Sequence, residues 1–112
     1  MTSGSNLTIT NCELYNNQSG FFFYDSAKGT IANCNAHHNS VSGCLVRSDA
    51  NPAFTNTTFH DNTYGIIADD NGSGLFLNTA VHTNNSAGVV FKTGSSTEIK
   101  KSKIYNNGVG GK

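Results

Sequence analysis

Asparagine and glycine recur along this chain at an interval of 22 or 23 residues, and this repeat limits the folds open to it. Two columns keep the same phase over five repeats. The asparagine column is Asn17, Asn39, Asn62, Asn84 and Asn107. The glycine column is Gly20, Gly43, Gly65, Gly88 and Gly110. Two columns in register over the chain indicate a stack of one repeating structural unit.

Short apolar segments follow the same phase, which predicts three strands in each repeat. Leu7 precedes a first column that consists of Ile9, Ile31, Phe54, Phe76 and Ile99. A second column consists of Leu14, Ala36, Phe59, Val81 and Ile104. Two further columns follow the glycines: Phe21, Cys44, Ile66 and Val89, and then Phe23, Val46, Ala68 and Phe91. The alternation of apolar and polar residues is typical of strands with one buried face, so we expect these columns to form the core.

Three strands for every 22 or 23 residues predict a coil that climbs by one strand spacing per repeat. Each strand then pairs in parallel with its equivalent in the next coil, about 4.8 Å away. A further asparagine column, Asn11, Asn33, Asn56 and Asn78, has Lys101 in its fifth place. Asparagine tolerates the left-handed backbone of a sharp corner, and its amide bonds to the amide stacked above it. We therefore expect asparagine ladders at the corners of the coil.

With these features the chain resembles right-handed parallel β-helix repeats, as in the pectate-lyase-like superfamily. The segments that carry the resemblance are ITNCELYNNQSGFFF, IANCNAHHNSVSGCLV, FTNTTFHDNTYGII and FLNTAVHTNNSAGVVF, with IKKSKIYNNGVGG as a degraded fifth copy. The resemblance implies an all-β, right-handed parallel β-helix of about five coils. We expect one domain over residues 1–112, with coils near residues 3–25, 26–48, 49–69, 70–92 and 93–112. The same repeat occurs in lyases, hydrolases, epimerases, phage fibres and non-catalytic modules, so the fold does not name a function.

One outward column is rich in rings and is the candidate ligand-binding stripe. It consists of Tyr15, His37, His60, His82 and Tyr105. The column follows the inward Leu14 column, so its side chains are expected to face solvent, about 4.8 Å apart. The favoured interpretation is an aromatic stacking ladder, and a sugar-binding stripe is the first alternative. A divalent ion shared by two imidazoles, with help from Asp61 or His38, is a weaker alternative, and we predict no metal site.

Charged residues follow the strand after each glycine. The column is Tyr24, Arg47, Asp69 and Lys92, and Asp70 lies beside it. The resemblance implies that this region forms the cleft in enzymes of the superfamily, which use clustered Asp with Arg or Lys nearby. Asp69, Asp70 and Arg47 are thus the only candidate catalytic residues. Arg47, Asp69 and Lys92 read equally well as an alternating-charge ladder between coils, and the long cleft-forming loops are missing.

A second outward column is apolar and predicts an interface. Phe22, Leu45, Ile67 and Val90 alternate with inward positions, so we expect them to form an exposed stripe. Exposed apolar stripes usually mark interaction surfaces. We expect a homo-oligomer, most simply a dimer joined through this stripe. A partner chain on the stripe and end-to-end stacking of coils are the alternatives.

Charge and cysteine content limit the partners and the compartment. Residues 1–91 carry a formal charge of −4 and residues 92–112 carry +4, and the lysines of the second segment suit the guarding of an open strand edge. Three cysteines, Cys12, Cys34 and Cys44, cannot all pair, and no leader follows Met1, so free thiols and an intracellular location are favoured. The longest apolar runs are too short for a membrane helix. We expect no nucleic acid, no membrane and no cofactor.

The sequence therefore predicts a non-catalytic β-helix module for protein or glycan interaction. The alternative is a minimal or fragmentary carbohydrate-active enzyme of the lyase or hydrolase kind. The absent loops and the absence of a family catalytic signature favour the first.

Overall fold

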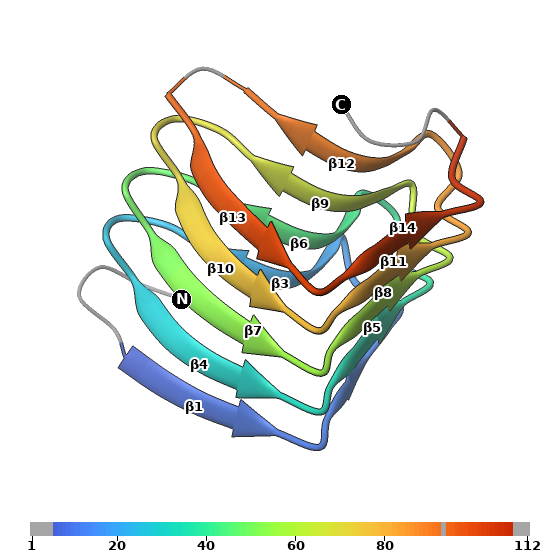
Figure 1. Ribbon diagram of the computed structural model, residues 1–112, viewed down its shortest axis with the longest axis horizontal. Coiled ribbons are helices and arrows are strands. Elements are labelled where there is room, and N and C mark those ends of the chain that lie inside the picture. Colours follow the sequence, from blue (N-terminus) through green and yellow to red (C-terminus); the bar gives the residue numbers. More distant parts are fainter. Residues whose placement is uncertain (1–5, 93, 109–112) are drawn as a thin grey trace.

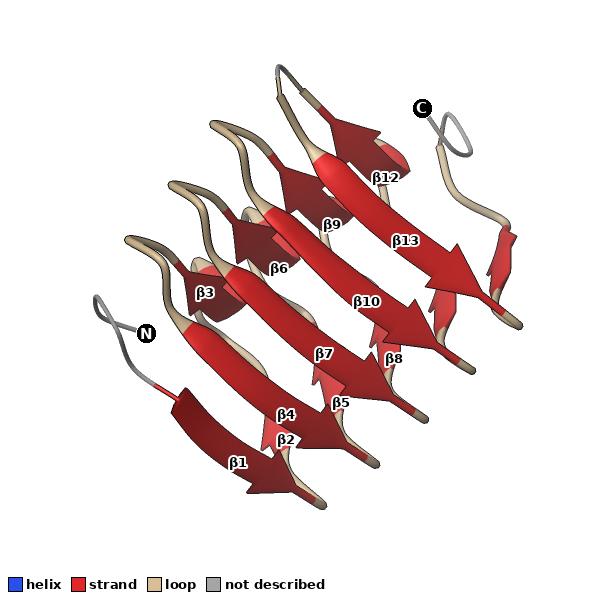
Figure 2. Cartoon of the chain, turned by 60° about the vertical axis from the view of Figure 1, so that its left-hand side comes forward, coloured by secondary structure: helices blue, strands red, loops and turns tan. Residues whose placement is uncertain are grey.

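Fourteen strands wind into a right-handed parallel β-helix in a computed structural model, which describes residues 6–92 and 94–108 (Figure 1). The strands of each coil fall into three parallel sheets, here named sheets A, B and C, that enclose the core (Figure 2). Sheets A and B have five strands each and sheet C has four. The described residues thus make four complete coils and the first two strands of a fifth. The expected fold class is confirmed.

Each sheet contains one strand from every coil. Sheet A consists of β1 (Asn6–Thr10), β4 (Lys28–Ala32), β7 (Asn51–Thr55), β10 (Ser73–Leu77) and β13 (Ser96–Lys100). Sheet B consists of β2 (Glu13–Leu14), β5 (Asn35–His37), β8 (Thr58–His60), β11 (Ala80–His82) and β14 (Lys103–Tyr105). Sheet C consists of β3 (Ser19–Phe23), β6 (Ser42–Val46), β9 (Tyr64–Ala68) and β12 (Ala87–Phe91).

The register of the strands reproduces the sequence columns. In sheet A, Ile31 pairs with Ile9 on one side and with Phe54 on the other, and Phe76 pairs with Ile99. The same in-register pairing runs through sheets B and C. Because equivalent residues stack directly on one another, one apolar column becomes one continuous strip of core.

Stacked aromatic rings fill the centre of the coil. Phe54 and Phe76 lie parallel with their centroids 4.7 Å apart, and Phe59 meets both rings edge to face. All three side chains are fully buried. Each ring therefore buries a large apolar surface against neighbours in its own coil and in the next one.

The core prediction is wrong for two side chains at the end of the stack. Phe91 is 37% exposed and Ile104 is 38% exposed, because no coil among the described residues packs over them. Ile9, Leu14 and Ile99 are only partly buried for the same reason. The side chain of Leu7 and the glycine position 110 lie outside the described part of the structure.

A ladder of buried asparagines joins the coils at the corner between sheets B and C. Asn62 shows the pattern: its backbone N–H and its Nδ2 both donate to Asn84 Oδ1, at 3.0 and 3.2 Å. Its Nδ2 also donates to the carbonyl oxygen of Ala36 at 3.1 Å. Asn39 and Asn84 repeat these contacts at their own steps, and Asn107 repeats the contact with a carbonyl oxygen, that of Val81. The ladder therefore satisfies backbone groups that would otherwise be buried without partners.

The left-handed residue at this corner precedes the ladder asparagine, contrary to the expectation that each turn asparagine adopts that conformation itself. Asn16, His38, Asp61, Thr83 and Asn106 have φ between 54° and 60°. The prediction holds at the other asparagine corner, where Asn11, Asn33, Asn56 and Asn78 have φ between 51° and 58° and Asn78 Nδ2 donates to Asn56 Oδ1. The column that begins at Asn11 therefore supplies left-handed corner residues, and the column that begins at Asn17 supplies hydrogen bonds between coils.

The glycine column is required by close approach to the ladder. A Cβ atom on Gly43 would lie 2.8 Å from the carbonyl oxygen of Gly65 and 2.9 Å from Asn62 Nδ2. Gly65 has equally close neighbours in the next coil. A larger residue would force the ladder and the adjacent strand apart, so the asparagine and glycine columns keep the same phase.

The three cysteines are free, as expected, but they differ in exposure. Cys34 and Cys44 are buried, whereas Cys12 in the first described coil is exposed. The Sγ atoms of Cys12 and Cys34 lie 3.2 and 3.3 Å from the carbonyl oxygens of Thr10 and Ala32, each two residues back. Thr57 and Ser102 make the same contact in later coils. The side chains of this column thus hydrogen-bond to the backbone at the corner between sheets A and B.

Truncation of Phe76 to alanine tests the ring stack. We expect Phe76→Ala to lower the free energy of unfolding by about 3–5 kcal/mol, because neighbours on both sides cannot close the cavity. Phe91→Ala is the matched control, since its ring is already 37% exposed, and its loss is expected to be smaller. Denaturant unfolding of both variants gives the values. A loss below about 1 kcal/mol for Phe76→Ala would contradict the core placement.

Candidate functional site

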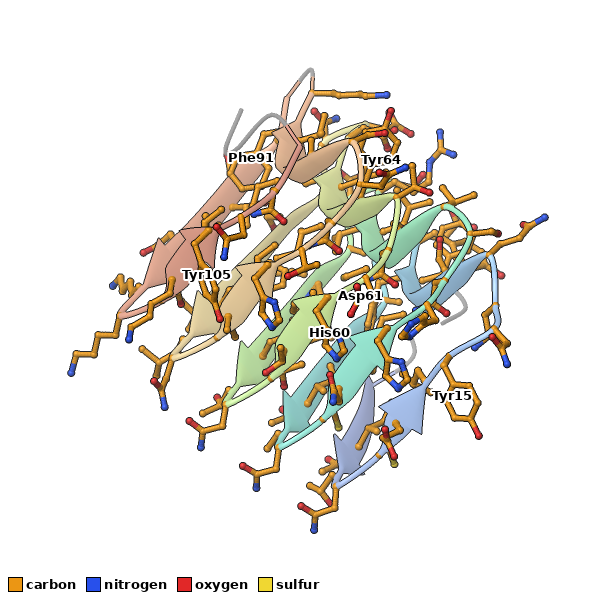
Figure 3. The ribbon with its side chains drawn as sticks, turned by 90° about the vertical axis from the view of Figure 1, so that its right-hand side faces the viewer. Tyr15, His60, Asp61, Tyr64, Phe91 and Tyr105 are labelled. Carbon is orange, nitrogen blue, oxygen red and sulfur yellow. The ribbon has the colours of Figure 1, made fainter. Side chains whose placement is uncertain are left out.

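Five rings stack along the outer face of sheet B and its edge, and we name Tyr15, His37, His60, His82 and Tyr105 the ring ladder (Figure 3). Successive ring centroids are 5.3, 5.0, 5.2 and 4.9 Å apart. The interplanar angles are 13° or less. The aromatic stacking ladder that the sequence favoured is present in the structure.

The pairing of sheet B explains the ladder. His37 pairs with His60, His60 with His82, and His82 with Tyr105 in a continuous parallel register. Each ring follows an inward residue of the core column, so alternation along the strand turns it outward. Rings one strand spacing apart can then meet face to face over the whole length of the sheet.

This stacking decides which surfaces of the rings a ligand can reach. Each histidine ring has a neighbour on both faces, so its faces are covered and only its outer edge is accessible. The side chains of His37 and His60 are 17% and 20% exposed. Tyr15 and Tyr105 end the ladder and are 53% and 44% exposed. A sugar therefore cannot lie flat on an inner ring, but it can hydrogen-bond to the row of ring edges.

A second row of polar side chains holds the histidines in place. His60 Nδ1 donates to Asp61 Oδ2 at 2.7 Å, and His82 Nδ1 lies 2.8 Å from Thr83 Oγ1. His37 Nδ1 lies 2.6 Å from His38 Nδ1, so one of these two nitrogens carries the bridging proton. In each pair the partner is the next residue, whose left-handed backbone brings its side chain beside the ring.

Two titrating groups of this site have shifted pKa values. The hydrogen bond from His60 lowers the pKa of the Asp61 carboxyl, although partial burial opposes the shift. Partial burial lowers the pKa of the His82 imidazole, and repulsion by a charged His60 lowers it further, while Asp61 acts in the opposite direction. The ladder therefore favours an ionised Asp61 and a neutral His82.

Shallow polar grooves run beside the ring ladder at the corner that leads to sheet C. One groove is lined by His38, Asp61, Thr63, Thr83 and Asn85, with the buried ladder residues Asn39 and Asn62 at its base. The adjacent one is lined by Asn16, Asn17, Gln18, His38, Asn39 and Ser40. Every residue of both linings carries an amide, hydroxyl, imidazole or carboxylate group, so the ridge and grooves together offer many donors and acceptors.

Sequence reasoning identified the rings but assigned no role to Thr83 and considered His38 and Asp61 only as metal ligands. The structure places all three as ring partners. Their shared signal is a polar residue directly after each ring position and directly before the ladder asparagine. The sequence also gave no indication that Glu13 is a partner of the ring ladder. Its Oε1 lies 3.1 Å from Nε2 of His37 in the adjacent coil.

The candidate catalytic residues lie on a different corner, between sheets C and A. Arg47 Nε is 3.4 Å from Asp69 Oδ1, which links adjacent coils as the charge-ladder interpretation predicts for this pair. Asp70 has a left-handed backbone and accepts a hydrogen bond from Ser48 Oγ at 3.1 Å. The arrangement brings Arg47 to Asp69 but leaves Asp70 on an exposed turn.

The predicted apolar stripe lies on the outer face of sheet C, but it is less exposed than expected. Phe22 is 40% exposed, and Leu45 and Val90 are partly buried. Ile67 is only 8% exposed, because it is stacked between Leu45 and Val90 in adjacent strands. The expectation of four outward exposed residues is therefore wrong for Ile67. Association of two copies through this stripe stays a prediction.

Within residues 6–92 and 94–108, no three His, Cys, Asp or Glu side chains are arranged to hold a metal ion. No helix there is long and apolar enough to cross a membrane.

The lowered pKa of His82 predicts a loss of stability in mild acid. The unfolded chain takes up a proton near the ordinary histidine pKa of 6.5, whereas folded His82 stays neutral to lower pH. The unfolded state then binds more protons, so stability falls as the pH drops below about 6.5. Asp61 acts in a lower window, since a lowered carboxyl pKa removes stability only below about pH 4.

An NMR titration of the histidine ring protons gives the His82 midpoint, which we expect below the ordinary value. We expect His82→Tyr, which keeps a ring in the ladder, to reduce the loss of stability between about pH 7.5 and pH 5.5. A His82 midpoint at or above 6.5 would contradict the assigned environment.

Comparison with known proteins identifies the fold family. The family model described as a right-handed β-helix region matches residues 1–111. Searches of curated proteins and of solved structures gave no significant match. The match spans nearly the whole chain and agrees with the three stacked parallel sheets. The chain therefore belongs to the right-handed β-helix family.

Proposed function

We propose that this chain is a non-catalytic β-helix module that binds an extended glycan along the ring ladder. The observation that carries the proposal is the unbroken row of five stacked rings with polar grooves beside it. The row presents imidazole and phenol ring edges at steps of 4.9 to 5.3 Å. A regular row of similar polar edges suits a ligand whose own groups repeat along its length.

A polysaccharide has this periodic character. Its hydroxyl groups pair with ring nitrogens, tyrosine hydroxyls and the amides of the adjacent grooves. Each single contact is weak in water, because it replaces a contact with solvent. Several contacts along one chain act together, since the first raises the effective concentration of the next. The low content of charged residues, 12% of the chain, favours such hydrogen bonding over charge pairing.

The contacts of Arg47, Asp69 and Asp70 favour a non-catalytic role for the chain. Asp69 and Arg47 are committed to an ion pair between coils, and Asp70 interacts with Ser48. The coil length of 22 or 23 residues leaves no room for the long loops that form a cleft. The resemblance of the repeats to pectate-lyase-like proteins supports a polysaccharide as the class of ligand.

Affinity electrophoresis through gels that contain neutral or acidic polysaccharides tests the proposal. We expect at least one polysaccharide to retard the chain. His60→Ala combined with His82→Ala removes two central edges and is expected to weaken binding about tenfold or more. Thr30→Ala on the outer face of sheet A is the matched control and is expected to bind like the unmodified chain.

Three results would count against the proposal. Absence of retardation by every polysaccharide would contradict the glycan as ligand. Equal losses for the ring variant and the Thr30 control would move the binding surface away from the ladder. Shortening of a polysaccharide that disappears in Asp69→Ala and Asp70→Ala would contradict the non-catalytic role.

A further inference from the structure

The two ends of the coil stack leave apolar and backbone groups accessible. Sheets A and B end at β13 and β14 on one side and at β1 and β2 on the other (Figure 2). The end strands of a sheet present backbone N–H and C=O groups on their outer edge. Ile104 is 38% exposed and Ile99 partly buried at one end, and Ile9 and Leu14 are partly buried at the other. At each end of the described stack, core columns are thus only partly covered.

The two ends match each other column by column. Ile99 and Ile9 belong to one core column, and Ile104 and Leu14 to another. Tyr105 and Tyr15 are the two ends of the ring ladder. A second copy placed one strand spacing beyond β14 would bring its first coil over these residues. Apolar columns would then continue as apolar, and the ring ladder would continue with Tyr15 over Tyr105.

The buried asparagine ladder would also continue across this junction. Inside the chain, Asn39, Asn62 and Asn84 each donate N–H and Nδ2 to the next Oδ1, as Asn84 donates to Asn107 at 3.0 and 2.9 Å. Asn17 donates only its N–H to Asn39, and its Nδ2 donates to the carbonyl oxygen of Tyr15. The contacts of Asn107 itself face the preceding coil, where its Nδ2 donates to the carbonyl oxygen of Val81. Asn17 of a second copy would offer Asn107 the Oδ1 acceptor that Asn107 offers Asn84.

Charges at the two ends are opposite. The last described coil carries Lys100, Lys101 and Lys103 with Glu98, and the first carries Glu13 and Asp25. Lys103 and Glu13 occupy the same column of sheet B, through Ala80, Thr58 and Asn35. In the continued register, Lys103 of one copy therefore lies opposite Glu13 of the next. Such cross-strand pairs of opposite charge stabilise a sheet, and like charges destabilise it.

We propose that this chain associates end to end with further copies of itself, so that β13 and β14 of one copy pair with β1 and β2 of the next. The contact joins two different surfaces, so it does not close and runs on into filaments. Sheet C, which has four strands, takes no part in the pairing. Lysines on an edge strand usually prevent docking. Here they repel another basic end and attract the acidic one.

Sedimentation velocity at increasing protein concentration tests association, and electron microscopy tests its shape. We expect elongated species that grow with concentration and shrink as salt is added, since salt screens the charges. Glu13→Lys places two lysines opposite each other, and Lys103→Glu places two glutamates opposite each other. Each single variant is expected to associate about tenfold more weakly.

Charge exchange separates this proposal from a general effect of charge. The double variant Glu13→Lys with Lys103→Glu restores opposite charges and is expected to associate like the unmodified chain. An equimolar mixture of the two single variants is also expected to associate, because each supplies the end that fits the other. Lys28→Glu on β4, which is not an end strand of sheet A, is the matched control and is expected to leave association unchanged. Circular dichroism checks that every variant keeps the fold.

Other outcomes would overturn the proposal. A monomer at all concentrations and low salt would mean that the lysines guard the edge instead. Association that ignores both single charge reversals, or that disappears in Leu45→Asp on sheet C, would place the contact on the apolar stripe. If neither the double variant nor the mixture associates, the proposed register, in which Lys103 lies opposite Glu13 of the next copy, is contradicted.

Discussion

The hydrogen bonds of the buried asparagine ladder are the interaction on which the rest of this structure depends. Asn39, Asn62 and Asn84 each tie one coil to the next through two donors to one Oδ1, and to the preceding coil through a backbone carbonyl. The geometry works only when equivalent residues lie directly above one another. Glycine as the second residue of each sheet C strand follows from the same contact, because a side chain there would strike the ladder. Ladder and glycine together fix the register of the sheets.

Register in turn produces the surface that we assign to function. Rings on sheet B stack only because each coil repeats the position of the coil before it. The register that stacks the core side chains on the inner face therefore also stacks the rings on the outer face. The residue before each ladder asparagine has a left-handed backbone, and its side chain lies beside a ring. One corner therefore both bonds the coils and orients the imidazoles. The same order makes the two ends of the stack complementary.

The repeat made the coil, its three strands and most core columns predictable, because in-register stacking turns a sequence period directly into spatial neighbours. The burial of single outward residues was harder to predict, since Ile67 is covered by side chains from two neighbouring strands. Phe91 and Ile104 follow the core pattern and are still exposed, because burial depends on a coil beyond them. The ring partners were missed because their position depends on backbone φ, which the spacing of residue types does not encode.

Replacement of one central ladder residue tests the dependence of the fold on these hydrogen bonds. Asn62→Ala removes the acceptor of the Asn39 N–H and the donor to the Ala36 carbonyl, and both groups lie in the buried corner. The account predicts a fall in the free energy of unfolding of about 2–5 kcal/mol in a denaturant titration. Asn85→Ala, at an exposed position, is expected to change it by less than about 0.5 kcal/mol. Equal and small losses for the two variants would contradict the central place of the ladder.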